Sequence, residues 1–149
     1  CTQYGRSADS SAMDLASSHN HTDVVRLLCT ASVNTNSTHT MLNGKKDDTS
    51  PLMRAARKGS AAVVNVLLSF GADPTYRCTH WGGEPDDQSA LDVGFDIDEV
   101  NSELVSVLVQ GGADPFAVLE STALSPMEVA CEEDKMGCVV VMDSRPSVM

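Results

Sequence analysis

The stretch SPLMRAARKGSAAVVNVLLSFGADP (50–74) contains two apolar segments separated by Lys-Gly-Ser and closed by Gly-Ala-Asp-Pro. Ser50 can cap the first segment as a helix, and Pro51 fits the first turn, where its missing N–H costs nothing. Apolar residues at 63, 64, 67 and 68 follow a helical spacing. Gly71 suits the left-handed backbone that ends a helix. The stretch predicts a helix–turn–helix unit, which must stack on neighbours because one helix pair cannot bury its own faces.

This unit recurs along the chain. SAMDLASSHN, SPLMRAARKG, SALDVGFDID and SPMEVACEED begin at residues 11, 50, 89 and 125, at spacings of 39, 39 and 36 residues, and a second apolar stretch follows each. The pattern resembles the ankyrin repeat, whose period is about 33 residues and whose signature is T-P-L-H-x-A. The resemblance predicts an all-α ankyrin-repeat solenoid of about four helix–turn–helix repeats joined by finger loops.

One ankyrin-repeat domain is expected over residues 1–149. The approximate repeats are 5–37, 44–76, 83–117 and 119–149, with extended fingers at 34–48 and 74–88. Each of these fingers is about six residues longer than the family's period allows. QYGR (3–6) looks like the tail of an earlier finger. Asp143 replaces the equivalent of Leu68, which suits either a capping end or a fragment of a longer array.

Charge changes sign along the chain, whose formal net charge is −11. Residues 1–80 carry eight basic and six acidic side chains, whereas residues 81–149 carry two and fifteen. An acidic chain is a poor partner for nucleic acid, because phosphate binding draws on clustered Lys and Arg. We expect a protein partner with a basic region facing repeats three and four.

The second finger, PTYRCTHWGGEPDDQ (74–88), holds the only Trp of the chain. Trp, Tyr and Arg are the side chains most often found at interface hot spots. The resemblance implies that partners bind the fingers and the concave face of the first helices. The predicted partner-binding residues are Tyr76, Arg77, His80, Trp81, Arg57, Lys58, Met41, Asp96, Glu132 and Glu133, and the same mapping places Thr49 on this face. For Trp81, packing against the enlarged loop stays open as a second interpretation.

No sequence pattern indicates a catalytic, metal or cofactor site. The chain lacks G-x-x-x-x-G-K-S/T and G-x-S-x-G, and its five cysteines form no C-x-x-C pair. His80 with Cys78 lacks the further ligands that zinc requires, and His19 and His21 are expected to diverge at a helix end. Cys29 is predicted to be a core thiol, and Cys78 a loop thiol open to oxidation. We predict a non-enzymatic protein without a cofactor.

No apolar run approaches the ~18–20 residues that span a bilayer, so no membrane insertion is expected. The odd cysteine count favours an intracellular setting, cytoplasmic or, after removal of a targeting peptide, organellar. The sequence thus predicts a protein–protein interaction module that acts as a scaffold, an adaptor or a stable subunit of a larger complex. A regulatory ankyrin segment of a larger multidomain enzyme is the alternative.

Overall fold

The computed structural model describes residues 12–36, 38, 41–42, 45–95, 101–117 and 123–128. Its helices and strands are α1 (Ala12–Ser18), α2 (Thr22–Thr30), β1 (Met41–Leu42), β2 (Lys45–Lys46), α3 (Pro51–Arg57), α4 (Ala61–Ser69), β3 (His80–Trp81), β4 (Glu84–Pro85), α5 (Ala90–Phe95) and α6 (Ser102–Gln110). The three helix pairs begin where the sequence repeats predict them. A helical turn at 126–128 follows Ser125, the predicted cap in the fourth repeat, and residues 129–149 lie outside the described residues.

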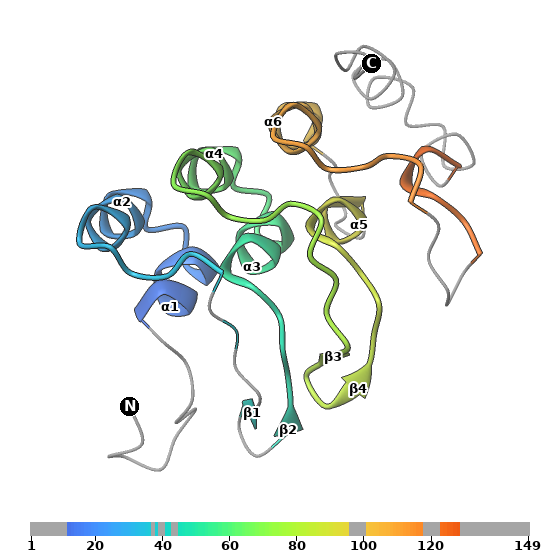
Figure 1. Ribbon diagram of the computed structural model, residues 1–149, viewed down its shortest axis with the longest axis horizontal. Helices are drawn as coiled ribbons and strands as arrows, with labels where there is room; N and C mark the ends of the chain where they lie inside the picture. The colour runs from blue at the N-terminus through green and yellow to red at the C-terminus, as the bar shows by residue number, and fades with distance from the viewer. Residues whose placement is uncertain are drawn as a thin grey trace.

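The helix pairs stack side by side in two layers (Figure 1). The first helices form one layer, in which α3 packs between α1 and α5, and the second helices form the other, in which α4 packs between α2 and α6. The hairpins β1–β2 and β3–β4 are both antiparallel and project from the same side of the stack (Figure 1). The architecture is therefore the predicted helical solenoid, with little sheet.

The predicted signals for helix ends occur in the central repeat. The Ser50 hydroxyl accepts a hydrogen bond from the Met53 N–H at 3.2 Å, and Pro51 occupies the first turn of α3. Gly71 has a φ of +92° after α4, a backbone conformation that a side chain would strain. These local choices set where α3 and α4 begin and end, and hence which faces they present to their neighbours.

In repeats three and four, the serine before the first helix of the pair also bonds to a carboxylate three residues on. Ser89 donates from its N–H and its hydroxyl to one carboxylate oxygen of Asp92, and Ser125 makes the same two bonds to Glu128. Each carboxyl therefore occupies the place that His holds in the ankyrin signature and closes a capping box. Ser11, the equivalent residue of the first repeat, lies outside the described residues.

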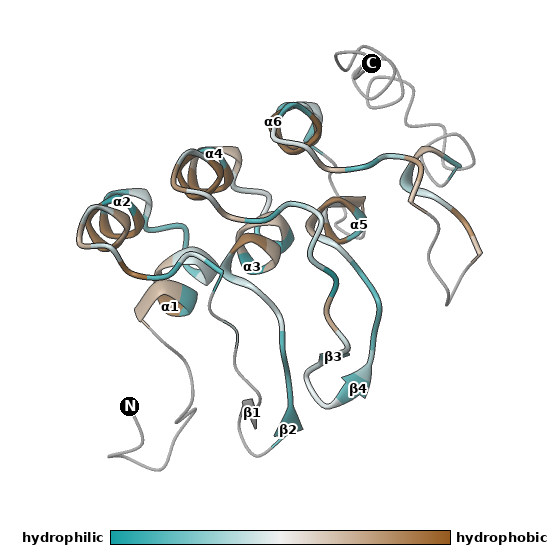
Figure 2. Ribbon diagram, viewed as in Figure 1, coloured by the Kyte–Doolittle hydropathy of each residue, from teal (hydrophilic) through white to brown (hydrophobic). Residues whose placement is uncertain are grey.

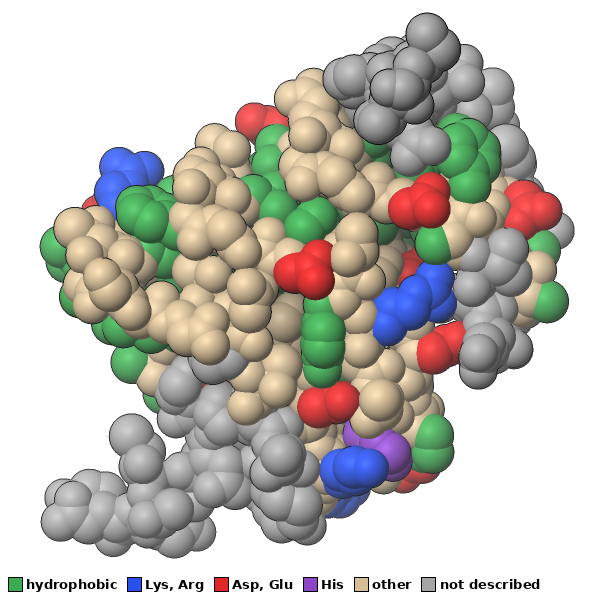
Figure 3. All heavy atoms as spheres, viewed as in Figure 1, with side chains coloured by type: hydrophobic (Ala, Val, Ile, Leu, Met, Phe, Trp, Pro, Cys, Tyr) green, Lys and Arg blue, Asp and Glu red, His purple; other side chains and the backbone are tan. Residues whose placement is uncertain are grey.

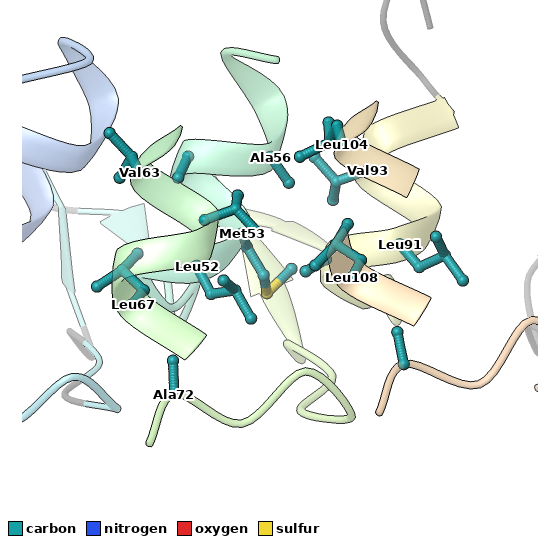
Figure 4. Close-up of a cluster of buried hydrophobic side chains, with 14 of the residues drawn as sticks. Leu52, Met53, Ala56, Val63, Leu67, Ala72, Leu91, Val93, Leu104 and Leu108 are labelled. Carbon is teal, nitrogen blue, oxygen red and sulfur yellow. The ribbon is translucent and has the colours of Figure 1, made fainter. Parts of the chain in front are cut away.

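The hydrophobic core runs continuously through the stack. Leu52, Met53, Val63, Leu67 and Leu108 are all no more than 1% exposed. Figure 2 shows apolar colour concentrated on the helices and polar colour along the fingers. In Figure 4 the labelled side chains of α3, α4, α5 and α6 form one cluster, with Met53 near its centre. Each large buried side chain contributes about 1.5–3 kcal/mol, so stacking between repeats holds these short helices.

The two described cysteines are both buried. Cys29 is a core thiol, as predicted. The prediction that Cys78 is a loop thiol open to oxidation is wrong, because Cys78 is only 2% exposed and belongs to the hydrophobic core. Burial, followed by the negative charges of Asp86 and Asp48, raises the pKa of Cys78 to about 12.

We expect Cys78 to resist alkylation in the native protein at about pH 8, because almost none of it is thiolate well below its pKa. Mass-spectrometric mapping after maleimide treatment, with and without denaturant, measures this directly. Cys78 should react only in denaturant. Labelling of native Cys78 at the rate of an exposed thiol would contradict the buried position.

Candidate functional site

The second hairpin and the strand leading into α3 lie against each other. The Gly83 N–H donates to the Lys46 carbonyl at 2.9 Å, and the Asp48 N–H donates to the His80 carbonyl at 3.1 Å. Gly83 has a φ of +100°, and a Cβ there would lie 2.8 Å from Cδ of Lys45. The close approach and the positive φ together require glycine at this turn. The second finger is thus hydrogen-bonded to residues 46–48, at the end of the first.

The side chain of Asp48 binds the backbone and one hydroxyl of the second finger. Its carboxylate accepts from the Thr79 N–H, the Thr79 hydroxyl and the His80 N–H, each at 2.8 Å. Desolvation raises the pKa of Asp48, but the hydrogen bonds from His80 and Thr79 together outweigh it and lower the pKa. Asp48 also provides the carbonyl that accepts from the Tyr76 hydroxyl at 2.8 Å.

The lowered pKa of Asp48 predicts a contribution to stability that depends on pH. The carboxylate stabilises the folded state above its unfolded pKa, about 3.9, and this contribution disappears as pH falls through the lower folded pKa. We expect wild type to unfold at a higher temperature than Asp48→Asn near neutral pH. The difference should shrink below about pH 4. Thermal unfolding followed by circular dichroism measures it, and a difference that does not vary with pH would contradict the assignment.

Asp47 forms the second attachment and connects it to the helices. One carboxylate oxygen accepts from the Thr49 N–H, the Thr49 hydroxyl and an Arg54 Nη2 group at 3.1 Å, and the other accepts from the Gly82 N–H at 2.9 Å. Arg54 also lies 3.4 Å from Asp14 of α1, through its Nε. Asp47 and Asp48, which we name the finger clamp, therefore join the second finger to repeat two, and Arg54 extends the connection to repeat one.

Arg57 and Trp81 are brought together from α3 and the second finger. The Arg57 guanidinium lies over the Trp81 ring, 5.5 Å from its centroid. Trp81 is half-buried and packs on the edge of the core, while Arg57 and its neighbour Lys58 are exposed at the end of α3. An arginine stacked on an indole face is held in one orientation by a cation–π interaction. Trp81 thus packs within the protein, on the edge of the core and against Arg57, and its contact with a partner stays a prediction.

The other aromatic and basic residues predicted in this finger have polar groups bonded within the protein. Tyr76 is half-buried with its hydroxyl on Asp48, and burial raises its pKa. Arg77 donates to the Asp87 carbonyl at 3.2 Å. His80 lies in β3, where its N–H bonds to the finger clamp. Figure 3 shows a His and a Lys or Arg side chain together at the tips of the fingers.

The structure describes the remaining predicted residues only in part. Met41 lies in β1, where its backbone pairs with Lys46. Asp96, Glu132 and Glu133 lie outside the described residues. Thr49 is fully buried, which corrects its placement on the partner-facing surface: its hydroxyl points to Asp47.

Sequence reasoning missed the finger clamp. Asp47 and Asp48 belong to the run KKDD (45–48), which has the composition of a solvated polar loop. Their partners in the second finger are 31 to 35 residues further along the chain, beyond the reach of any local pattern. The one local signal is Asp-x-Thr at 47–49, a spacing at which an aspartate accepts from the backbone two residues on.

His19 and His21 differ from the prediction. Their rings stack, with centroids 6.1 Å apart and planes 11° from parallel, because the tight turn between α1 and α2 brings them onto one side. Within the described ranges, no three His, Cys, Asp or Glu side chains gather as a metal ion would require. The helices of those ranges include none that is long and apolar enough to cross a bilayer.

A shallow hollow of about 530 Å³ lies at the starts of α2, α4 and α6. Its lining is mostly small or amide side chains, including Asn20, Asn65 and Asn101. Ser60 donates its hydroxyl to Asn20 across the junction of repeats one and two. The hollow therefore lies along a repeat junction, at the helix ends remote from the fingers.

Comparison with known proteins decides the family. A family model described as ankyrin repeats in three copies matches residues 3–78, half of the chain. The chain belongs to the ankyrin-repeat family. Ankyrin repeats are generally non-catalytic modules that bind other proteins. A curated relative is the ankyrin repeat and KH domain-containing protein mask-1 of Caenorhabditis elegans, which is 33% identical over 89 residues. That match covers 60% of this ankyrin chain but only 3% of the length of mask-1.

Solved ankyrin structures share the fold at low identity. An ankyrin repeat domain from Acinetobacter baumannii superposes with a TM-score of 0.72 at 17% identity, over 89% of this chain and 63% of that one. The ankyrin repeat domain of Bcl-3, a member of the IκB family, gives 0.67 at 22% identity, over 91% of this chain and 52% of that one. These likenesses show the ankyrin fold.

Proposed function

We propose that the protein is a non-catalytic binding module, which acts as a scaffold, an adaptor or a stable subunit of a larger complex. A partner protein lies on the second finger and the exposed end of α3, with Trp81 and Arg57 at the centre of the contact. The supporting observation is the stacked Arg57–Trp81 pair, which orients two residue types common at hot spots toward one surface.

The finger clamp supports this proposal energetically. Surfaces that are rigid before binding lose less conformational entropy when the partner docks. The carboxylates of Asp47 and Asp48 fix the second finger against repeat two through bonds to Gly82, Thr79 and His80. Trp81 is thereby held in place by the residues on both sides of it, so the surface is formed in the free protein.

The charge gradient favours a partner of matching polarity. Three lysines are exposed: Lys58 follows Arg57 in the chain, and Lys45 and Lys46 contact Gly83 of the second finger. The second half of the chain, by contrast, is strongly acidic. We propose that a basic region of the partner faces repeats three and four, with Asp96, Glu132 and Glu133 as its contacts. Such charges chiefly steer association and set orientation. The setting that we propose is intracellular.

Affinity capture from source lysate, followed by dissociation constants for each captured protein, tests the site. Trp81→Ala and Arg57→Ala should each weaken binding of the same protein. At a hot spot the loss is about 2 kcal/mol or more, which is about 30-fold in Kd. Phe70→Ala is the matched control, because Phe70 is an exposed aromatic residue at the end of α4 and is not part of the Arg57–Trp81 pair.

Circular dichroism must first show that all three variants keep the helical signal. A protein that binds wild type, Trp81→Ala and Arg57→Ala equally would disprove the proposed site, and capture of none would disprove the binding role in that source. A regulatory ankyrin segment of a multidomain enzyme is the alternative; the small share of mask-1 that the chain matches is consistent with a segment of a longer protein. The sequence of the full-length source polypeptide tests it, since the alternative requires an enzyme domain in the same polypeptide.

A further inference from the structure

Six large hydrophobic side chains are exposed among the described residues, and they form two groups. Phe70 and Phe116 lie at positions that are also exposed in a neighbouring repeat. The equivalent of Phe70 is Gly111, and the equivalent of Phe116 is Thr75. The other four lie at positions that are buried in at least one later repeat. We name these four the leading face; they are Leu15, Val24, Leu27 and Val33.

The residues of the leading face are more exposed than the equivalent residues of repeats two and three. Val24 is 44% exposed, but its equivalents Val63 and Leu104 are fully buried. Leu27 is 70% exposed, and its equivalent Val66 is 7% exposed. Figure 3 shows hydrophobic side chains gathered over α2 at this end of the stack.

The other two residues behave in the same way. Leu15 of α1 is 48% exposed, whereas its equivalent in α5, Val93, is fully buried. Val33, after α2, is 37% exposed, and its equivalent Ala72 is 6% exposed. The leading face therefore extends over both helices of repeat one and the loop that follows them.

In the interior, the preceding repeat covers these positions. α2 packs on α4, and α1 packs on α3. The junction also has a polar contact: the Asn36 amide donates to the Gly71 carbonyl and accepts from the Asp73 N–H at 2.7 Å. The equivalent groups of repeat one are the Ser32 carbonyl and the Asn34 N–H, and neither is bonded to another described residue in this way.

We propose that the leading face is a stacking interface for one more ankyrin-type helix pair, which precedes residue 1 in the same polypeptide. A terminal repeat that faces solvent needs a polar outer face, and repeat one instead keeps apolar residues at the interior positions. The QYGR sequence (3–6), which resembles the tail of a finger, supplies the connection that such a repeat requires. The preceding first helix packs on α1 and its second helix packs on α2.

Cysteine accessibility tests this in the full-length source polypeptide and in the 149-residue chain. Leu27→Cys and Phe70→Cys variants of both are treated with a maleimide, and mass spectrometry follows each site. In the 149-residue chain the two sites should react at similar rates. In the full-length polypeptide, Leu27→Cys should react at least about tenfold more slowly, because the covering repeat must open first. Phe70→Cys, the control, should react at the same rate in both.

Three outcomes would overturn the proposal. The first is equal labelling of Leu27→Cys in both proteins, since nothing would then cover the face. The second is protection in the 149-residue chain that grows with protein concentration, because a second copy would be the occupant. The third is a source polypeptide without a helix pair ahead of residue 1.

A Leu27→Lys variant gives an independent readout: it should lower the Tm of the full-length polypeptide and leave that of the 149-residue chain unchanged. The result does not depend on the binding role of Trp81.

Discussion

Asp47→Ala should lower the free energy of unfolding by about 3 kcal/mol or more. The Asp47 side chain is 1% exposed and faces the Arg54 guanidinium, whose side chain is 13% exposed. Removing one partner of a buried ion pair leaves the other charge poorly compensated, and here the Gly82 N–H loses its acceptor as well. Asp14 remains as a second carboxylate for Arg54 but lies farther away, at 3.4 Å.

Asp73→Ala is the matched control for Asp47→Ala. Asp73 accepts from the N–H and the hydroxyl of Thr75, two residues on, as Asp47 does from Thr49, but it is exposed and no ion pair with a described residue involves it. Its removal should cost about 1 kcal/mol or less. Urea unfolding followed by circular dichroism gives both values. Equal losses would show that the buried ion pair contributes nothing beyond the local turn.

Leu67→Ala should cost about 2–5 kcal/mol of unfolding free energy, because it leaves a cavity in the centre of the stack. Leu67 is fully buried in α4, the helix that packs on α2, α3 and α6. In a solenoid, each repeat is stabilised mainly by its neighbours, so a cavity here weakens two junctions at once. The unfolding midpoint in urea should therefore fall for the whole array.

Leu27→Ala makes the same chemical change on an exposed site and serves as its control. Leu27 is 70% exposed, and a substitution at such a surface position changes stability by no more than about 0.5 kcal/mol. Equal losses of unfolding free energy for the two variants in the 149-residue chain would contradict the burial of Leu67 in the centre of the core.

The helices were predictable because their signals are local. Ser50, Pro51 and Gly71 act through bonds and backbone angles within a few residues, so their spacing locates α3 and α4 directly. The apolar stripe of α4 was equally visible, and Val63, Val64 and Leu67 are fully buried as it predicts. Repetition strengthened each signal, since the same pattern occurs in four copies.

The candidate site was predictable only as a set of residue types. The composition of the second finger identified Trp81 as notable, but it could not show that Arg57 lies over the ring. Cys78 was misplaced for a related reason. Its segment has the composition of a polar loop, and only the fold shows that this thiol belongs to the hydrophobic core.

The repeat and its helix pairs follow from the sequence, because helix caps and apolar periodicity act over short stretches of chain. How the fingers are joined, and which apolar residues are left uncovered, depends on the tertiary structure. The bonds of Asp47 and Asp48 to the second finger connect residues more than 30 positions apart, and each such pairing depends on the stacking of whole repeats. The exposure of Leu27 likewise depends on a neighbouring repeat, since its equivalent Val66, on which α2 packs, is 7% exposed and Leu27 is 70% exposed.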